Sequence, residues 1–300
     1  MPPFAVIRFL TIVTVAVAVV QSAGAQSPAW SADLAGIRAA ASVIPGRRPL
    51  RVNVQKFAES RRTKNFSIEG APADPSVQAR TAFQVVFADG RVMVDAGMDR
   101  QVHRFFGRGA DEPYDSAAAR EVERALVDAR LIVVTHEHGD HVAGVVHTPR
   151  ASELAPKTIL TRGQVRTLLA SPQMPEIALT AQAAARYMVV DYDKYFALAP
   201  GMALVAAAGH TPGSQMVFVA LESGVEYLLI GDAAWHMDGV RLVRGKDAPW
   251  VSEDRNAVIE QLRWLNALSR TERRLLIVAS HDDEQLRELI RDGALGGRVE

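Results

Sequence analysis

Strands that alternate with helices predict an α/β protein with mixed sheets, and three patterns support this fold class. Short apolar runs bounded by turn residues recur along the chain and indicate buried strands, as at 131–134 and 275–279. A longer segment with helical periodicity, 252–268, indicates an amphipathic helix. Turn signals at 88–90 and 222–224 separate apolar runs and indicate hairpins, so antiparallel pairs are expected beside parallel ones.

The first half of the chain begins with strands and then mixes strands with helices. Asp115 is expected to cap a helix whose apolar positions include Val122 and Leu126. The expected elements are a strand over 50–57, a polar loop over 60–75, a hairpin over 81–95, an irregular segment over 98–114 as a candidate loop above a pocket, a helix over 115–129, a strand over 131–135 and a helix opening at 142–146.

The second half repeats the same rhythm of strands and helices. A hairpin is expected where the apolar runs 216–221 and 227–230 flank a Glu-Ser-Gly turn. The other expected elements are strands over 158–160, 188–190, 203–207 and 275–279, and helices over 163–169, 252–268 and 283–291.

The composition excludes several classes of function. Lysine plus arginine and aspartate plus glutamate each number 34 in the 300 residues, so the net charge is near zero. Such a chain lacks the electrostatic footprint of a nucleic-acid-binding protein or of one bound to an anionic membrane surface. It also has no cysteine, which leaves no disulfide, no thiolate metal ligand and no cysteine nucleophile.

The N-terminal residues 1–25 are predicted to be a signal peptide. An apolar run over 9–20 follows the single charge of Arg8, and Ala23 and Ala25 fit a signal-peptidase site. The run is too short to span a bilayer comfortably. We therefore expect a lead-in over 26–49 with at most a short helix, one domain over 50–300, and a periplasmic or secreted protein with no stable membrane association after cleavage.

Metal-capable side chains follow four of the apolar runs. The run that ends at Val134 leads into Thr-His-Glu-His-Gly-Asp-His, and three later runs end at a single histidine or aspartate. Strands that end at one edge of a sheet gather such residues in one crevice. Nitrogen and oxygen donors of this kind suit Zn²⁺. The seven candidate ligands exceed the needs of one tetrahedral ion and suit two: His136, His138, Asp140, His141, His210, Asp232 and His281.

This order of residues resembles the metallo-β-lactamase superfamily of hydrolases, over roughly 85–281. The resemblance implies a four-layer αββα sandwich, with two mixed sheets back to back, helices on the outer faces, and the site at one edge. It also implies that Asp232 bridges two metals and that Asp95 orients a ligand histidine. The implied ligands are His136, His138 and His210 for the first metal, and Asp140, His141 and His281 for the second.

The function that the resemblance implies is hydrolysis of an ester or lactone in a small-molecule substrate. A hydroxide that bridges the two divalent ions attacks the carbonyl, and Asp140 carries a proton to the leaving oxygen. Zn²⁺ is the expected metal, although sites of this type accept Mn²⁺, Fe²⁺ or Co²⁺.

Alternatives on the same fold stay open: a β-lactam hydrolase, a thioesterase of the glyoxalase-II type, or a non-catalytic metal-binding relative. The lack of cysteine and the presence of Asp232 disfavour the zinc β-lactamases. Trp235 stands where the homoserine-lactone lactonases carry a tyrosine, and it forms either an apolar wall or part of the core. The remaining histidines, His103, His147 and His236, are expected to be structural, and Glu137 to be solvated or to support a ligand.

Overall fold

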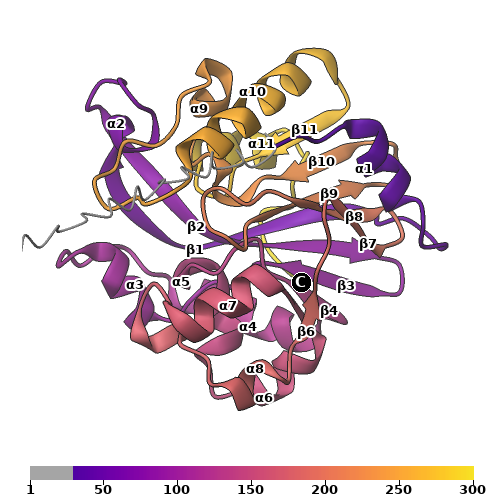
Figure 1. Cartoon of the computed structure of the whole chain (residues 1–300), viewed down its shortest axis with the longest axis horizontal. Coiled ribbons are helices and arrows are strands. Elements are labelled where there is room, and N and C mark those ends of the chain that lie inside the picture. The colour runs from indigo at the N-terminus through magenta and orange to yellow at the C-terminus, as the bar shows by residue number, and fades with distance from the viewer. Residues whose placement is uncertain (1–29) are drawn as a thin grey trace, which may run out of the picture.

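The computed structural model describes residues 30–300, which form two β-sheets packed face to face with helices on both outer faces (Figure 1). This is the predicted αββα sandwich. The predicted signal peptide over 1–25 lies outside the described residues, as does the start of the lead-in. Within 30–300, no helix combines the length and the apolar character that a membrane crossing requires.

The first sheet has six strands in chain order, antiparallel from β1 to β3 and parallel from β3 to β6. Its inner parallel strands, β3 to β5, are largely buried between the second sheet and the helices, which explains their continuous apolar runs, whereas the edge strand β6 is more exposed. The strands are β1 (Arg51–Thr63), β2 (Pro75–Phe87), β3 (Gly90–Val94), β4 (Leu131–Val133), β5 (Thr158–Thr161) and β6 (Met188–Val190).

The second sheet has five strands in the order β11-β10-β9-β8-β7. The strands β7 to β10 pair antiparallel, and β10 pairs parallel with β11, so β8, β10 and β11 all point the same way. The strands are β7 (Tyr195–Ala199), β8 (Met202–Ala206), β9 (Gln215–Ala220), β10 (Glu226–Leu229) and β11 (Leu275–Val278).

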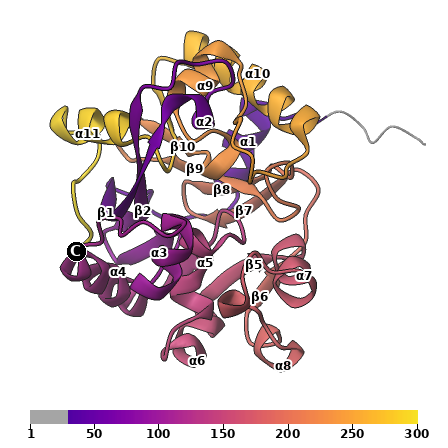
Figure 2. The ribbon, with the colours of Figure 1, turned by 90° about the vertical axis from the view of Figure 1, so that its left-hand side faces the viewer.

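The helices form the outer layers (Figures 1 and 2). The layer beside the first sheet contains α3 (Arg100–Gly107), α4 (Ser116–Asp128), α5 (Gly139–Val146), α6 (Ala151–Leu154), α7 (Arg162–Ala170) and α8 (Ala181–Ala184). The layer beside the second sheet contains α1 (Leu34–Ala41), α9 (Met237–Leu242) and α10 (Arg255–Thr271). The remaining helices are α2 (Lys64–Ser67), between β1 and β2, and α11 (Asp283–Arg291), which follows β11.

Three apolar layers hold the sandwich together. One lies between the first sheet and its helices and includes Met93 and Leu126. The middle one joins the facing sides of the two sheets and includes Val85 and Val217. The third lies between the second sheet and α1, α9 and α10 and includes Ile37, so the short helix expected in the lead-in packs on the second sheet.

The expected polar loop over 60–75 is wrong in part. β1 continues to Thr63, α2 follows, and β2 already begins at Pro75, which pairs with Thr63. The long β1–β2 arm reaches past the first sheet toward α9 (Figure 2). Its outer part is polar, so it lacks the apolar alternation of a half-buried strand, while its backbone still forms the ladder.

The expected irregular segment over 98–114 is also wrong in part, because it contains α3. Asp99 caps this helix by accepting a hydrogen bond of 2.8 Å from the Val102 amide. Val102, Phe105 and Phe106 have the i, i+3, i+4 spacing of a helical face, but this short helix ends close to two glycines, which favoured a loop. Four further elements, α6, α8, β7 and α9, were not expected from the sequence, nor were the short 3₁₀ turns.

Several local expectations are confirmed. The hairpin over 81–95 is the β2–β3 pair, which turns between Phe87 and Gly90. Asp115 caps α4 through the amides of Ala117 and Ala118. The helix over 283–291 has the bounds of α11.

Gly144 sets how closely α5 packs against the loop after β3. A Cβ atom at Gly144 would lie 2.1 Å from the Ala96 carbonyl oxygen, which is backbone and cannot rotate away. We expect Gly144→Ala to lower the free energy of unfolding by about 3 kcal/mol through this overpacking. Thermal denaturation measures the loss. Gly107→Ala is the control, since its Cβ would meet no atom nearer than 3.9 Å; equal stability of the two variants would contradict the packing argument.

Candidate metal centre

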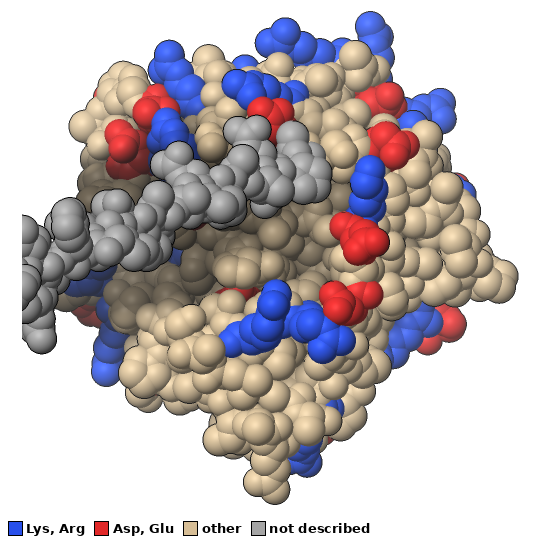
Figure 3. Space-filling view, viewed as in Figure 1, with Lys and Arg blue, Asp and Glu red and all other residues tan. Residues whose placement is uncertain are grey.

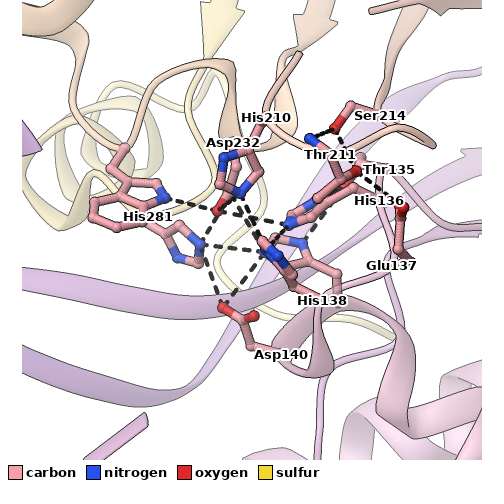
Figure 4. A network of polar contacts seen from close by, with 12 residues as sticks. Thr135, His136, Glu137, His138, Asp140, His210, Thr211, Ser214, Asp232 and His281 are labelled. Carbon is pink, nitrogen blue, oxygen red and sulfur yellow. Dashed lines mark hydrogen bonds and ion pairs between the residues drawn. The ribbon is translucent and has the colours of Figure 1, made fainter. Parts of the chain in front are cut away.

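The structure brings all seven predicted ligands together at one edge of the sandwich (Figure 4). They come from the segments that follow β4, β8, β10 and β11, as the strand-end pattern predicted. Their donor atoms form two groups, and within each group these atoms lie within 4.8 Å of one another. The groups are His136, His138, His210 and Asp232, and Asp140, His141 and His281.

The first group centres on His138. Its Nδ1 atom lies 3.1 Å from His136 Nε2 and 3.1 Å from His210 Nε2. Oδ2 of Asp232 lies 3.4 Å from His210 Nε2 and 3.7 Å from His136 Nε2. Three imidazole nitrogens and one carboxylate oxygen therefore face a common point.

The second group joins the first turn of α5 to the end of β11. His141 Nε2 lies 3.2 Å from His281 Nε2. Oδ2 of Asp140 lies 3.5 Å from His141 Nε2 and 3.4 Å from His281 Nε2. Asp140 and His141 are both buried on α5, so the helix fixes their relative position.

Asp232 faces both groups. Its Oδ2 belongs to the first group, while its Oδ1 lies 3.0 Å from His281 Nε2 and 3.4 Å from His141 Nε2 in the second. The Oδ1 atom is buried and has no hydrogen-bond partner among the described residues. Asp232 lies within a short 3₁₀ turn that starts at Gly231, directly after β10.

The donor set fits two divalent ions. Two imidazole nitrogens bound to one tetrahedral Zn²⁺ lie about 3.3 Å apart, because each Zn–N bond is about 2.05 Å long. The spacings of 3.1 to 3.2 Å between facing nitrogens are close to that value. A cation between them would also satisfy the buried Oδ1 of Asp232.

Four of the five histidines have their second ring nitrogen held by an acceptor. Such a contact fixes the tautomer, so that the other nitrogen presents its lone pair to the centre. The four contacts are His136 Nδ1 to Thr135 Oγ1 at 3.2 Å, His141 Nδ1 to Asp95 Oδ2 at 2.8 Å, His210 Nδ1 to Glu253 Oε2 at 2.9 Å, and His281 Nδ1 to the Ala79 carbonyl at 2.6 Å.

Asp95 supports His141, as the resemblance implied for a ligand histidine. It also accepts hydrogen bonds from the Thr135 amide at 2.7 Å and the Thr135 hydroxyl at 3.0 Å. Its φ of 63° is in the left-handed region, which is uncommon for a residue other than glycine. These contacts hold the backbone in that conformation at the end of β3.

The electrostatics of the site keep most of the donors available, with His141 as the exception: burial would lower its pKa, but the carboxylates of Asp140, Asp95 and Asp232 raise it well above the usual value. Burial, and then the neighbouring His141, hold the pKa of His136 well below its usual value; burial and His210 lower the pKa of His138 to about 3. Burial alone would raise the pKa of Asp140 and Asp232, but the adjacent histidines hold both well below the usual range. Neutral imidazoles and ionised carboxylates are the forms that bind metals.

Arg80 forms a buried ion pair with Asp140. Its Nη1 contacts Asp140 Oδ2, its Nη2 donates to Ser60 Oγ at 3.0 Å, and its guanidinium lies 4.8 Å from the centre of the Phe106 ring. This positive charge lowers the pKa of Asp140 further, after His141. Asp140 therefore stays ionised beside the cavity.

A cavity of about 380 Å³ opens onto the centre. Its size is typical of a small-molecule site. The surface is hollowed between the elements of the two outer layers (Figure 3). Aromatic side chains from both sides line the cavity, together with His138, Asp140 and Asp232; these aromatic residues are Phe105, Phe106, Trp235 and Trp250. The segment over 98–114 thus lies at the pocket, as expected, although as a helix.

Trp235 combines the two roles that the sequence left open. It lines the cavity and is nevertheless only 8% exposed. Its Nε1–H donates a hydrogen bond of 2.7 Å to Asp232 Oδ2. The indole therefore orients the carboxylate that faces both groups.

Glu137 is buried and links two ligand-bearing loops. It accepts hydrogen bonds from the Thr211 hydroxyl at 2.7 Å and the Gly213 amide at 3.2 Å (Figure 4). Of the two roles expected for it, support of a ligand loop fits and solvation does not. Among the other histidines, His236 accepts from the Asp238 amide as the N-cap of α9 and does not line the cavity.

His103 and His147 lie outside the two donor groups. His103 is buried on α3, where its ring lies 5.5 Å from that of Tyr114. His147 lies just after α5, with its Nε2 3.6 Å from Asp99 Oδ2. Both positions agree with the structural roles expected for them.

Sequence reasoning missed Arg80, Lys246 and Glu253. Lys246 Nζ lies 2.9 Å from Glu253 Oε2, the same oxygen that contacts His210. Glu253 is 43 positions from His210 in the chain, and Arg80 is 60 positions from Asp140. No local motif marks any of the three. For Arg80 the sequence offered only a weak signal, a charged residue inside a strand pattern. For Lys246 and Glu253 it offered no signal.

The sequence profile described as the metallo-beta-lactamase superfamily matches residues 79–279. The chain belongs to this superfamily. The match covers more than half of the chain and includes six of the seven predicted ligands. A comparison with curated proteins finds no significant match.

Solved structures share the fold. A quorum-quenching N-acyl homoserine lactone lactonase aligns with a TM-score of 0.63 and 17% identity, over 81% of this chain and 97% of its own. A probable metal-dependent hydrolase from Staphylococcus aureus aligns with a TM-score of 0.59 and 13% identity, over 80% and 91%. A dizinc quorum-quenching lactonase aligns with a TM-score of 0.56 and 15% identity, over 79% of this chain and 90% of its own. With the family match, these support the expected metal-dependent hydrolase.

Metal analysis tests the ligand assignment, which stays a prediction. We expect the purified protein to hold close to two divalent ions per chain, and Asp232→Ala or His138→Ala to hold about one or fewer, since each removes a shared or central donor. Inductively coupled plasma mass spectrometry gives the stoichiometry, and circular dichroism checks the fold. Wild-type metal content in both folded variants would refute the site.

The low pKa of His138 makes the metal-free protein sensitive to acid. The unfolded chain binds a proton near pH 6.5, whereas folded His138 does so only at about 3, so unfolding becomes easier as the pH falls from 7 toward 3. The slope is up to about 1.4 kcal/mol per pH unit for this group. We expect urea denaturation of chelator-treated His138→Asn to show a shallower pH dependence than wild type.

His147→Asn is the control for this measurement, because its imidazole lies outside the two donor groups. An equal pH dependence for wild type and His138→Asn would show that His138 titrates normally in the fold.

Proposed function

We propose that the protein is an exported hydrolase that uses two divalent metal ions, with Zn²⁺ the preferred metal, to open an ester or lactone bond in a small molecule. The observation that carries this proposal is the Asp232 carboxylate, which directs one oxygen to each donor group beside an accessible cavity. Export is supported by the apolar segment and small residues of the first 25 positions.

The seven donors would hold the ions, with Asp232 shared between the groups. Two bound ions supply an activated water molecule and polarise the oxygen of a carbonyl group. Protein side chains orient the ligands and transfer the proton. Trp235 orients Asp232, and the acceptors behind the histidines keep their lone pairs directed inward.

Asp140 is the proposed proton carrier. It lines the cavity, and its Oδ2 is held by Arg80, so Oδ1 is the oxygen left to accept a proton and pass it to the leaving group. His141 and then Arg80 oppose the effect of burial and keep this carboxylate in the ionised form, which can take up a proton and release it readily to the leaving oxygen. General acid–base catalysis of this kind contributes about 10²- to 10⁴-fold to a rate.

The cavity wall favours a substrate with an apolar group beside the scissile bond. Trp235, Trp250 and Phe105 offer flat apolar surfaces. The indole N–H of Trp235 donates its hydrogen bond to Asp232, so the ring offers the substrate an apolar surface with no free hydrogen-bond donor. The fold shared with N-acyl homoserine lactone lactonases makes lactones the first compounds to test.

A substrate panel on the metal-loaded protein tests the proposal. We expect turnover of a lactone or an aryl ester to exceed that of a thioester and of a β-lactam, and kcat/KM to fall at least about 100-fold in Asp140→Asn. Glu260→Ala, on the exposed side of α10, is the control. A protein that holds two ions but hydrolyses none of these compounds would refute the proposed function.

A further inference from the structure

The segment over 243–254, between α9 and α10, connects the cavity wall with the first donor group. It contains no helix or strand, yet Lys246 is only 4% exposed and the Glu253 side chain only 7%. Buried charges in an irregular segment are costly unless they are paired and hydrogen-bonded. Their contacts therefore show what this segment holds in place.

Glu253 contacts the His210 ring nitrogen that faces away from the donor group. Its Oε2 accepts a hydrogen bond of 2.9 Å from His210 Nδ1, which leaves Nε2 as the nitrogen that faces His138 and Asp232. The same oxygen lies 2.9 Å from Lys246 Nζ. One carboxylate atom thus joins a predicted ligand to a buried ammonium group.

Lys246 extends the chain of contacts to the shared carboxylate. Its Nζ donates to the main-chain carbonyl of Asp232 at 2.6 Å and lies 3.4 Å from that of Ala233. It also lies 5.7 Å from the centre of the Trp235 ring. The pair of Lys246 and Glu253 therefore connects Asp232, after β10, with His210, after β8.

The backbone of the same segment holds the His210 loop. The Asp254 amide donates to the Gly209 carbonyl at 2.9 Å, and Gln261 on α10 donates to the carbonyls of Ala207 and Ala208 at 3.0 Å. No hydrogen bond or ion pair of the described residues joins Lys246 or Glu253 to the second donor group. Glu253 therefore acts on the first group, and Lys246 is linked to the second only through the backbone of the shared Asp232.

Residues of this segment also form the cavity wall. Trp250, Val251 and Ser252 line the cavity next to Glu253. The Trp250 ring lies 4.9 Å from that of Phe66 on α2, and the Arg108 guanidinium lies 4.4 Å from its centre on the other side. Trp250, which forms part of the cavity wall, is thus only three residues before Glu253, the acceptor that holds His210.

We propose that Lys246 and Glu253 are positioning residues that set the affinity and geometry of the first metal group, and that the segment 243–254 couples this group to the substrate wall. Glu253 fixes the tautomer and direction of His210. Lys246 neutralises Glu253 and fixes the backbone of Asp232. The second group has its own carboxylate, Asp95, behind His141, so we expect Lys246 and Glu253 to affect it less.

Chelator competition with the zinc-loaded full chain tests this proposal. We expect Glu253→Ala to weaken one of the two bound ions by about 10- to 100-fold while the other changes less than about threefold, because contacts behind metal ligands have effects of that size. Glu253→Gln keeps the shape and an acceptor oxygen, so we expect a smaller loss. Lys246→Met removes the ammonium group that neutralises Glu253 and holds the Asp232 backbone, and we expect the larger loss at the same ion.

Two further measurements separate positioning from a general loss of stability. The visible spectrum of the cobalt-substituted protein should change for only one ion in Glu253→Ala, since only His210 is released. In Trp250→Ala, KM should rise, and the ion that Glu253→Ala weakens should be bound more weakly than in wild type while the other ion stays within about threefold. Glu260→Ala, an exposed glutamate of α10, is the matched control and should match wild type in every measurement.

Unchanged affinity of both ions in folded Glu253→Ala would overturn the proposal, and so would an equal loss at both. If Glu253→Ala does not fold, the ion affinities of Glu253→Gln and Lys246→Met test the proposal by the same two outcomes. These measurements need no substrate. A failure of the proposed hydrolysis therefore leaves this test intact, whereas a wild-type protein that binds fewer than two ions would refute the centre itself.

Discussion

The sharing of one carboxylate, Asp232, between two sets of imidazoles is the constraint on which the rest of the site depends. Its two oxygens lie 3.0 to 3.7 Å from four histidine nitrogens that come from both halves of the chain. That geometry requires β4 of one sheet and β8, β10 and β11 of the other to end at the same edge. The αββα sandwich provides this, because its two sheets pack face to face on a common apolar layer.

Such a concentration of buried polar groups is stable only with extensive pairing. Two buried cations, Arg80 and Lys246, each contact a buried carboxylate of the site. Acceptors behind the histidines come from β2, from the loops after β3 and β4 and from the segment before α10, and Asp95 adopts a left-handed conformation to reach His141. The centre is therefore held by the whole edge of the sandwich rather than by one loop.

The sequence was sufficient for the fold class and for candidate ligands that meet in space, because these depend on apolar runs and on a compact motif at a strand end. It was insufficient where contacts join distant positions. The acceptor Glu253 lies in an irregular segment, and the outer β1–β2 arm is polar, so neither carries a periodic signal. The helix α3 was missed because it is short and glycines near its end favoured a loop, although its apolar residues have helical spacing.

The position of Trp250 beside Glu253 has an evolutionary consequence. A mutation that reshapes this wall to admit a new substrate would also disturb the support of a predicted metal ligand, so selection for a new specificity would meet a cost in metal retention. Phe105, on the opposite wall, is half exposed and belongs to α3, which carries no predicted ligand. Divergence of substrate range is therefore expected to concentrate on α3, with 243–254 changing more slowly.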